Sequence, residues 1–164
     1  FVFLTQNAAE GENYGLELNL NSDLSDDLDI FVNLGLLNTE IKSWESRPEI
    51  EGREQAHAPS NSYSFGLNYR PTPVTYLNLH ATGKSGFYYS DSHNNKSDSY
   101  ILLNSSFGYN YEDWVVELWV RNLFDEYYAT RGFYFGNEAP DFADTLYERH
   151  GDPRHFGLSI RYDF

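Results

Sequence analysis

The last nine residues of the chain alternate strictly between apolar and polar side chains. The apolar positions are Phe156, Leu158, Ile160, Tyr162 and Phe164. Because successive side chains of a β-strand point to opposite faces, this segment predicts a strand with one apolar and one polar face. Such a strand has to place its apolar face against either a protein core or lipid.

The same period of two recurs in most of the chain. The other alternating segments are residues 1–6, 14–20, 28–36, 63–69, 75–84, 101–111 and 114–120, although Phe31 and Leu37 break the pattern in the third of them. The sequence therefore predicts an all-β protein with about eight strands. Most of these segments approach the roughly 9 to 11 residues of a tilted membrane strand, whereas strands of soluble sheets average about 5 to 6 residues.

The connections between these segments alternate in length. Short turns at 22–27, 71–73 and 112–113 come between longer loops at 7–13, 43–60, 90–97 and 129–153. In an antiparallel sheet alternate connections lie at the same end, so short turns and longer loops are sorted to opposite ends. This arrangement is typical of an antiparallel transmembrane β-barrel.

The composition favours a sheet with one face exposed to water. Charged residues and histidines on the predicted polar face are Glu17, Asp29, Arg70, His80, Lys84, Glu117, Arg121, His155, Arg161 and Asp163. They are too many to bury in a small soluble core, whereas a barrel lumen would hydrate them. No apolar run is long enough for a membrane-spanning helix. The formal charge of −14 argues against a nucleic-acid partner.

Three motifs then resemble the TonB-dependent outer-membrane receptors. The family's Asn-Leu-Phe-Asp-x-x-Tyr motif is matched by Asn122, Leu123, Phe124, Asp125 and Tyr128. Residues 151–164 are similar to the family's terminal strand, and residues 13–18 to its Gly-x-Glu strand. The motifs occur in the family's order and span nearly the whole chain.

The resemblance implies a barrel of about 22 antiparallel strands that encloses a plug domain and imports a scarce nutrient, most commonly a ferric siderophore, with energy from TonB. Residues 1–164 would be the C-terminal part of that barrel, without the plug. The start within an apparent strand also favours a piece of a longer chain. Tyr162 and Phe164 would form the signal that the barrel-assembly machinery reads. The implied partners are outer-membrane lipid, the TonB complex through the plug, that machinery and the nutrient, in a Gram-negative outer membrane.

Candidate ligand contacts lie in the loops that are expected to face outward. They are Arg47, Arg53, His57, His93, Arg131, Phe133, Tyr134, Phe135 and Arg149. Histidines could touch an iron complex and arginines could pair with anionic groups, but solvated loop charge and loop packing are the plainer interpretations. Acidic residues outnumber the loop arginines, which disfavours a highly anionic ligand. The motif at residues 122–128 is expected to be structural, because a strand bends into a loop there.

The sequence predicts neither enzyme activity nor a metal or cofactor site. It lacks cysteine, a phosphate-binding glycine loop and a recognisable nucleophile cluster. Two other classes of protein remain as alternatives. One is a freestanding eight-stranded outer-membrane barrel with a structural or adhesin role, since eight strands suffice to close a small barrel. The other is a soluble lipocalin-like binder, which would turn its apolar residues inward.

Overall fold

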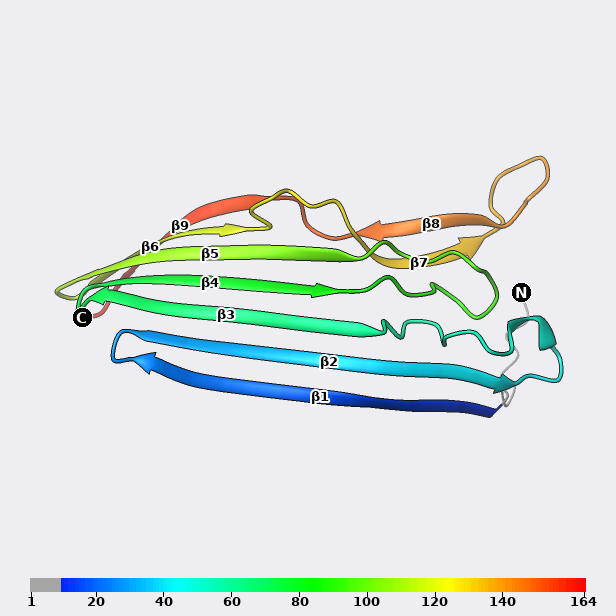
Figure 1. Ribbon diagram of the computed structural model, residues 1–164. Coiled ribbons are helices and arrows are strands. Elements are labelled where there is room, and N and C mark those ends of the chain that lie inside the picture. The colour runs from blue at the N-terminus through cyan, green and yellow to red at the C-terminus, as the bar shows by residue number, and fades with distance from the viewer. Residues whose placement is uncertain (1–9) are drawn as a thin grey trace.

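The computed structural model describes residues 10–164, which form a seven-stranded antiparallel sheet and a separate two-stranded hairpin (Figure 1). The large sheet contains β1 (Glu10–Ser25), β2 (Leu28–Ser43), β3 (Asn61–Thr72), β4 (Thr75–Lys84), β5 (Tyr100–Tyr111), β6 (Trp114–Arg121) and β9 (His155–Tyr162). The hairpin contains β7 (Ala129–Phe135) and β8 (Thr145–His150), and a short 3-10 helix, η1 (Pro48–Ile50), follows β2. Each strand pairs with the next along the chain, except that β6 pairs with β9 across the hairpin.

The predicted all-β antiparallel architecture is confirmed, but several boundaries differ. Residues 10–13, predicted as loop, belong to β1, because β2 continues beyond residue 36 to Ser43 and provides their ladder partners. The predicted loop at 129–153 contains β7 and β8, which are 7 and 6 residues long and form ladder pairs only with each other. The strand predicted at residues 1–6 lies outside the described residues.

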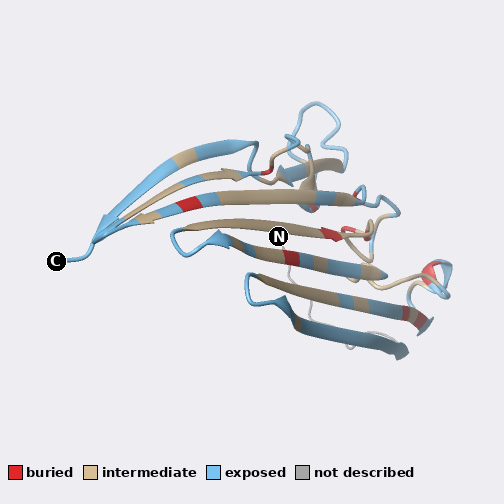
Figure 2. Ribbon diagram, turned by 60° about the vertical axis from the view of Figure 1, so that its left-hand side comes forward, coloured by how far each residue is buried: buried red, intermediate tan, exposed pale blue. Residues whose placement is uncertain are grey.

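The register aligns apolar side chains into rows that cross the sheet. One row, from β1 to β5, contains Leu20, Val32, Phe65, Ala81 and Leu103. Another, from β2 to β9, contains Leu28, Tyr69, Leu77, Phe107, Leu118 and Leu158. No second layer covers this face in the described part of the chain, so many of its side chains are exposed, and Phe156 is 80% exposed. The sheet is accordingly mostly intermediate or exposed in Figure 2.

The buried hydrophobic residues gather at one end of the sheet. Those of the described chain are Ile41, Ile50, Phe87 and Tyr89, which lie at the end of β2 and in the long connections. The two-residue turns at 26–27, 73–74 and 112–113 lie at the opposite end with the C-terminus (Figure 1). The predicted sorting of connections by length is therefore present, and the tightest packing is on the side of the long ones.

The polar face pairs aromatic rings with glycines across strands. The ladder partners are Phe31 with Gly66, Tyr76 with Gly108, and Trp119 with Gly157. A Cβ atom on Gly66 would overlap the ring of Phe31, so this ring lies where only glycine leaves room. Phe31 breaks the sequence alternation because its ring covers a neighbouring backbone on the polar face.

Charged groups on the polar face also pair across strands. Arg70 Nη1 and Nη2 donate hydrogen bonds to Asp29 Oδ2 and Oδ1 at 2.6 and 3.0 Å, and the Tyr76 hydroxyl donates to Glu117 at 2.9 Å. Paired groups of this kind lower the cost of placing charge on a partly covered surface. Within residues 10–164, no helix has the length and apolar character needed to cross a membrane.

Candidate functional site in the loop assembly

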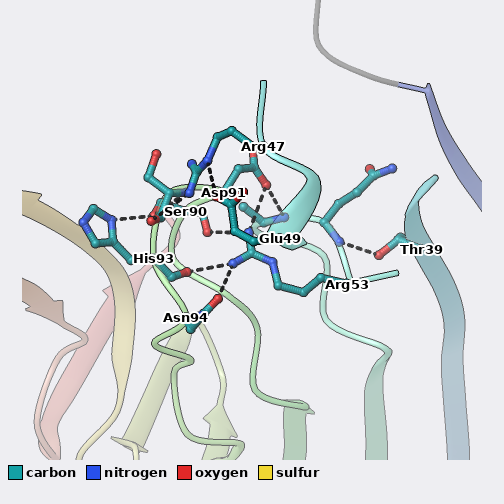
Figure 3. A network of polar contacts seen from close by, with 11 residues as sticks. Thr39, Arg47, Glu49, Arg53, Ser90, Asp91, His93 and Asn94 are labelled. Atoms are coloured by element: carbon teal, nitrogen blue, oxygen red, sulfur yellow. Dashed lines mark hydrogen bonds and ion pairs between the residues drawn. The ribbon is translucent and has the colours of Figure 1, made fainter. Parts of the chain in front are cut away.

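Three segments pack together at the end of the sheet that carries the long connections. They are residues 44–60 between β2 and β3, residues 85–99 between β4 and β5, and the β7–β8 hairpin, and together they are termed the loop assembly. Figure 3 shows part of the contact between the first two segments. All the candidate ligand contacts predicted from the sequence lie in this assembly.

Arg53 fastens residues 85–99 to residues 44–60. Its Nη1 donates hydrogen bonds to the carbonyl of His93 at 3.0 Å and to Asn94 Oδ1 at 2.9 Å, and its Nη2 donates to the carbonyl of Ser90 at 3.1 Å (Figure 3). The guanidinium also lies 4.5 Å from the ring centroid of Tyr88. Only 9% of the side chain is exposed. Because its donors are largely occupied inside the assembly, Arg53 has little capacity left for a ligand.

Arg47 and His57 join the same two segments. Arg47 Nη2 donates to the carbonyl of Ser92 at 3.2 Å, while its Nε donates to Glu49 at 3.1 Å (Figure 3). The backbone N–H of His57 donates to the carbonyl of Tyr88 at 2.9 Å. Segments that are far apart in sequence are therefore held by several hydrogen bonds, although the Arg47 side chain is still 27% exposed.

His93 and Tyr134 connect residues 85–99 to the hairpin. Their rings stack with centroids 3.5 Å apart, and His93 Nε2 lies 3.6 Å from a carboxylate oxygen of Asp144. The Ser90 hydroxyl lies 3.1 Å from His93 Nδ1. The Tyr134 hydroxyl is buried without a hydrogen-bond partner, and this burial raises its pKa. These two candidates contact each other, so the stack holds residues 85–99 against the hairpin.

Tyr89 forms a second link to the hairpin. Its ring lies against Gly132, and its hydroxyl donates a 2.5 Å hydrogen bond to Glu148. Burial, followed by this hydrogen bond, raises the pKa of Tyr89 well above its ordinary value. Tyr89 is not among the candidates that the sequence predicted. The aromatic run at residues 87–89, directly after a predicted strand, was the signal that would have found it.

The remaining candidates share the opposite face of the hairpin. Arg131 is the ladder partner of Arg149, Phe133 of Tyr147, and Phe135 of Thr145. Gly132 and the side chains of Tyr134 and Glu148 lie on the face that packs against residues 85–99. Arg131, Phe133 and Arg149 therefore belong to the other face, termed the outer face, where all three are exposed. The structure thus divides the predicted contacts into an enclosed group and an accessible group.

The motif at residues 122–128 joins β6 to the hairpin. The Asn122 side chain is buried, with Nδ2 donating to the carbonyls of Glu126 and Asp152 at 2.9 and 3.1 Å. Its Oδ1 accepts the backbone N–H of Glu126 at 2.8 Å, and its backbone N–H donates to Asn104 Oδ1 at 3.0 Å. Asn122 also adopts a positive φ of 49°, a conformation that asparagine tolerates better than most residues. One side chain therefore links the connection from β6 to the hairpin with the connection from β8 to β9.

The other motif residues differ in exposure. Asp125 Oδ1 accepts the backbone N–H of Arg154 at 2.7 Å, and the Leu123 N–H donates to the carbonyl of Leu103 at 2.8 Å. Tyr128 packs its ring over Gly151, whereas Phe124 is 70% exposed. These hydrogen bonds and the packing of Tyr128 stabilise the connection from within the protein. A structural role for the motif stays a prediction.

Metal-ligating side chains do not gather in the part of the chain that the structure describes. No group of three or more His, Asp or Glu residues among residues 10–164 is arranged to hold a metal ion. Among the candidate contacts, Arg131, Phe133 and Arg149 are accessible on the outer face of the hairpin.

A family model described as the β-barrel of TonB dependent receptor-like proteins matches residues 1–123. The chain belongs to this family. Its seven-stranded sheet is consistent with part of the wall of such a receptor barrel, which explains why one face is apolar and uncovered while the other is polar. The family is one of transport receptors.

Solved receptors have the same fold. The siderophore receptor PiuA from Acinetobacter baumannii is 18% identical with a TM-score of 0.79, over 93% of this chain and 22% of that chain. The ferric yersiniabactin uptake receptor FyuA from Yersinia pestis is 20% identical with a TM-score of 0.80, over 96% of this chain and 24% of that chain. BauA, the ferric preacinetobactin receptor from Acinetobacter baumannii, is 17% identical with a TM-score of 0.67, over 97% of this chain and 23% of that chain. This chain spans less than a quarter of the length of each of them.

Proposed function

We propose that residues 1–164 are the C-terminal part of the barrel of an outer-membrane receptor that imports a ferric siderophore with energy from TonB. The observation that carries the proposal is the continuous apolar face of a sheet that matches receptor barrels. The siderophore is suggested by the structural neighbours, which are named as receptors for a siderophore, for ferric yersiniabactin and for ferric preacinetobactin. On this proposal the plug domain belongs to the rest of the receptor.

The orientation of the proposed receptor follows from the sorted connections. The apolar rows face lipid and the polar face lines the lumen, so the loop assembly lies outside the cell and the short turns face the periplasm. The ligand meets the loop assembly first, where Arg47, Arg131, Phe133 and Arg149 are candidate contacts. TonB acts through the plug, and the barrel-assembly machinery reads Tyr162 and Phe164 at the end of β9.

The free edges of the sheet favour a receptor over a small complete barrel. Among the described strands, β1 and β9 each pair on one side only and do not pair with each other. Unpaired edges are incompatible with lipid, because backbone groups there would lack hydrogen-bond partners. In a larger barrel both edges would be covered by further strands. The exposed Leu and Phe side chains likewise argue against a soluble lipocalin-like binder.

The proposal is tested by the size of the native protein and by iron uptake. An antibody against residues 129–153 should detect a band several-fold heavier than 19.0 kDa in outer-membrane extracts. Cells from which the receptor gene is deleted, or which lack TonB, should lose uptake of radioactive iron from its siderophore. A band near 19.0 kDa that shifts on heating would indicate a freestanding barrel and overturn the proposal of a receptor. Full uptake without TonB would overturn the energy source.

A further inference from the structure

Two arginines form an unusual pair on the outer face of the hairpin. Arg131 and Arg149 are direct ladder partners between β7 and β8, and both are exposed. Like charges directly opposite each other destabilise an antiparallel pair. Within residues 10–164, neither guanidinium has a carboxylate oxygen within 4.0 Å. The pair is therefore an uncompensated concentration of positive charge in a chain whose formal charge is −14.

Two glutamates of the hairpin accept hydrogen bonds from tyrosines and do not pair with these arginines. Glu148 adjoins Arg149 in sequence but lies on the opposite face, where it accepts the Tyr89 hydrogen bond at 2.5 Å. Glu138 accepts a hydrogen bond from the Tyr147 hydroxyl at 2.9 Å. Both glutamates are thus held by tyrosines, and the arginines remain free to bind an anion from outside.

A β-bulge creates the pairing of the two arginines. The ladder shifts by one residue between Ala129 and Arg131, so Thr130 is the extra residue, and its hydroxyl donates to the Arg149 carbonyl at 2.9 Å. If the register of Ala129 and His150 continued without a bulge, Thr130 would stand opposite Arg149 and Arg131 opposite Glu148. The bulge replaces a favourable pair by two like charges, and bulges commonly redirect side chains at binding sites.

We infer that Arg131 and Arg149 bind an oxyanion group, a carboxylate or phosphate, on the ligand that the receptor imports. This inference rests on the proposed function. Two guanidinium groups can hold such a group bidentately. The neighbouring ladder pair, Phe133 and Tyr147, has nearly parallel rings with centroids 5.7 Å apart and gives the site an apolar border. The acidic surroundings favour a ligand with one such group over a highly anionic one.

The test measures binding of inorganic phosphate and of succinate to the purified full-length receptor in detergent micelles at low ionic strength. We expect the double variant Arg131→Gln with Arg149→Gln to bind both anions at least about tenfold more weakly than the wild type. Arg131→Lys should be intermediate, because an ammonium lacks the planar fork. Arg161→Gln is the matched control, since Arg161 is an exposed arginine on β9 at the opposite end of the sheet.

Stability provides the second readout. Without anion, the double variant should be at least as resistant to heat as the wild type, because the substitutions relieve repulsion, and phosphate should stabilise only the wild type. Equal anion binding by the wild type and the double variant would overturn the site. Binding of phosphate-bearing lipopolysaccharide, with no binding of either soluble anion, would assign the arginines to lipid and overturn the ligand inference. If one of these outcomes overturns the anion site while iron uptake is intact, the proposed function still stands.

Discussion

Replacing Asn122 tests whether one side chain holds the connection between β6, the hairpin and β9. In Asn122→Ala, the chain loses the three side-chain hydrogen bonds to Glu126 and Asp152, which measure 2.9, 3.1 and 2.8 Å. Each is worth about 1 kcal/mol net. The positive φ of 49° costs alanine about 1 kcal/mol more than asparagine. The free energy of unfolding should therefore fall by about 3 to 4 kcal/mol.

The measurement is urea unfolding of the receptor in detergent micelles, followed by tryptophan fluorescence. Asn137→Ala, at an exposed position between β7 and β8, is the control and should change the unfolding free energy by less than about 0.5 kcal/mol. Asn122→Gly separates the two causes, because glycine accepts a positive φ but makes no side-chain hydrogen bond. A glycine variant as stable as the wild type would refute the hydrogen-bond account, as would a loss below about 1 kcal/mol in Asn122→Ala.

Three further predictions follow from other contacts. Gly66→Val should lower the unfolding free energy by about 1 to 3 kcal/mol, because its side chain would overlap the ring of Phe31; adding Phe31→Ala should restore much of the loss in the same urea assay. Arg53→Met should make amide hydrogen exchange in residues 85–99 at least about tenfold faster and leave β2 unchanged, and unchanged loop exchange would contradict the fastening role. Because the folded pKa of Tyr89 is raised, its contribution to stability is complete below its ordinary pKa of about 10 and declines as pH rises further. The urea midpoint should thus fall more between pH 9 and pH 11 in the wild type than in Tyr89→Phe, and equal falls would rule this residue out as the cause.

Most of the barrel wall could be predicted from the sequence because its determinants are local. The period of two follows from backbone geometry alone, and each strand from β1 to β6 pairs with its neighbour in the chain. Even the exception, the pairing of β6 with β9, joins two strongly alternating segments. The polar and apolar faces of each strand could be predicted without information about distant residues.

The sequence could predict which residues belong to the candidate site, but not which of them are accessible to a ligand. Arg53 and Arg131 are both loop arginines in the sequence, yet the structure encloses the first and exposes the second. Their difference depends on which carbonyl groups the segment 85–99 brings near each guanidinium. Residue type indicated the capacity to bind an anion, but the availability of each arginine was not encoded locally.

The alternation of residues by itself determined the strands, their two faces and the sorting of short and long connections. Tertiary structure alone decided the β7–β8 hairpin, since consecutive aromatics at residues 133–135 obscure any period of two, and its inner face depends on support from residues 85–99. It also decided that Arg131 faces Arg149, because one extra residue shifts the register. Backbone periodicity is a property of a single segment, whereas register, burial and the partners of a side chain are properties of two segments in contact.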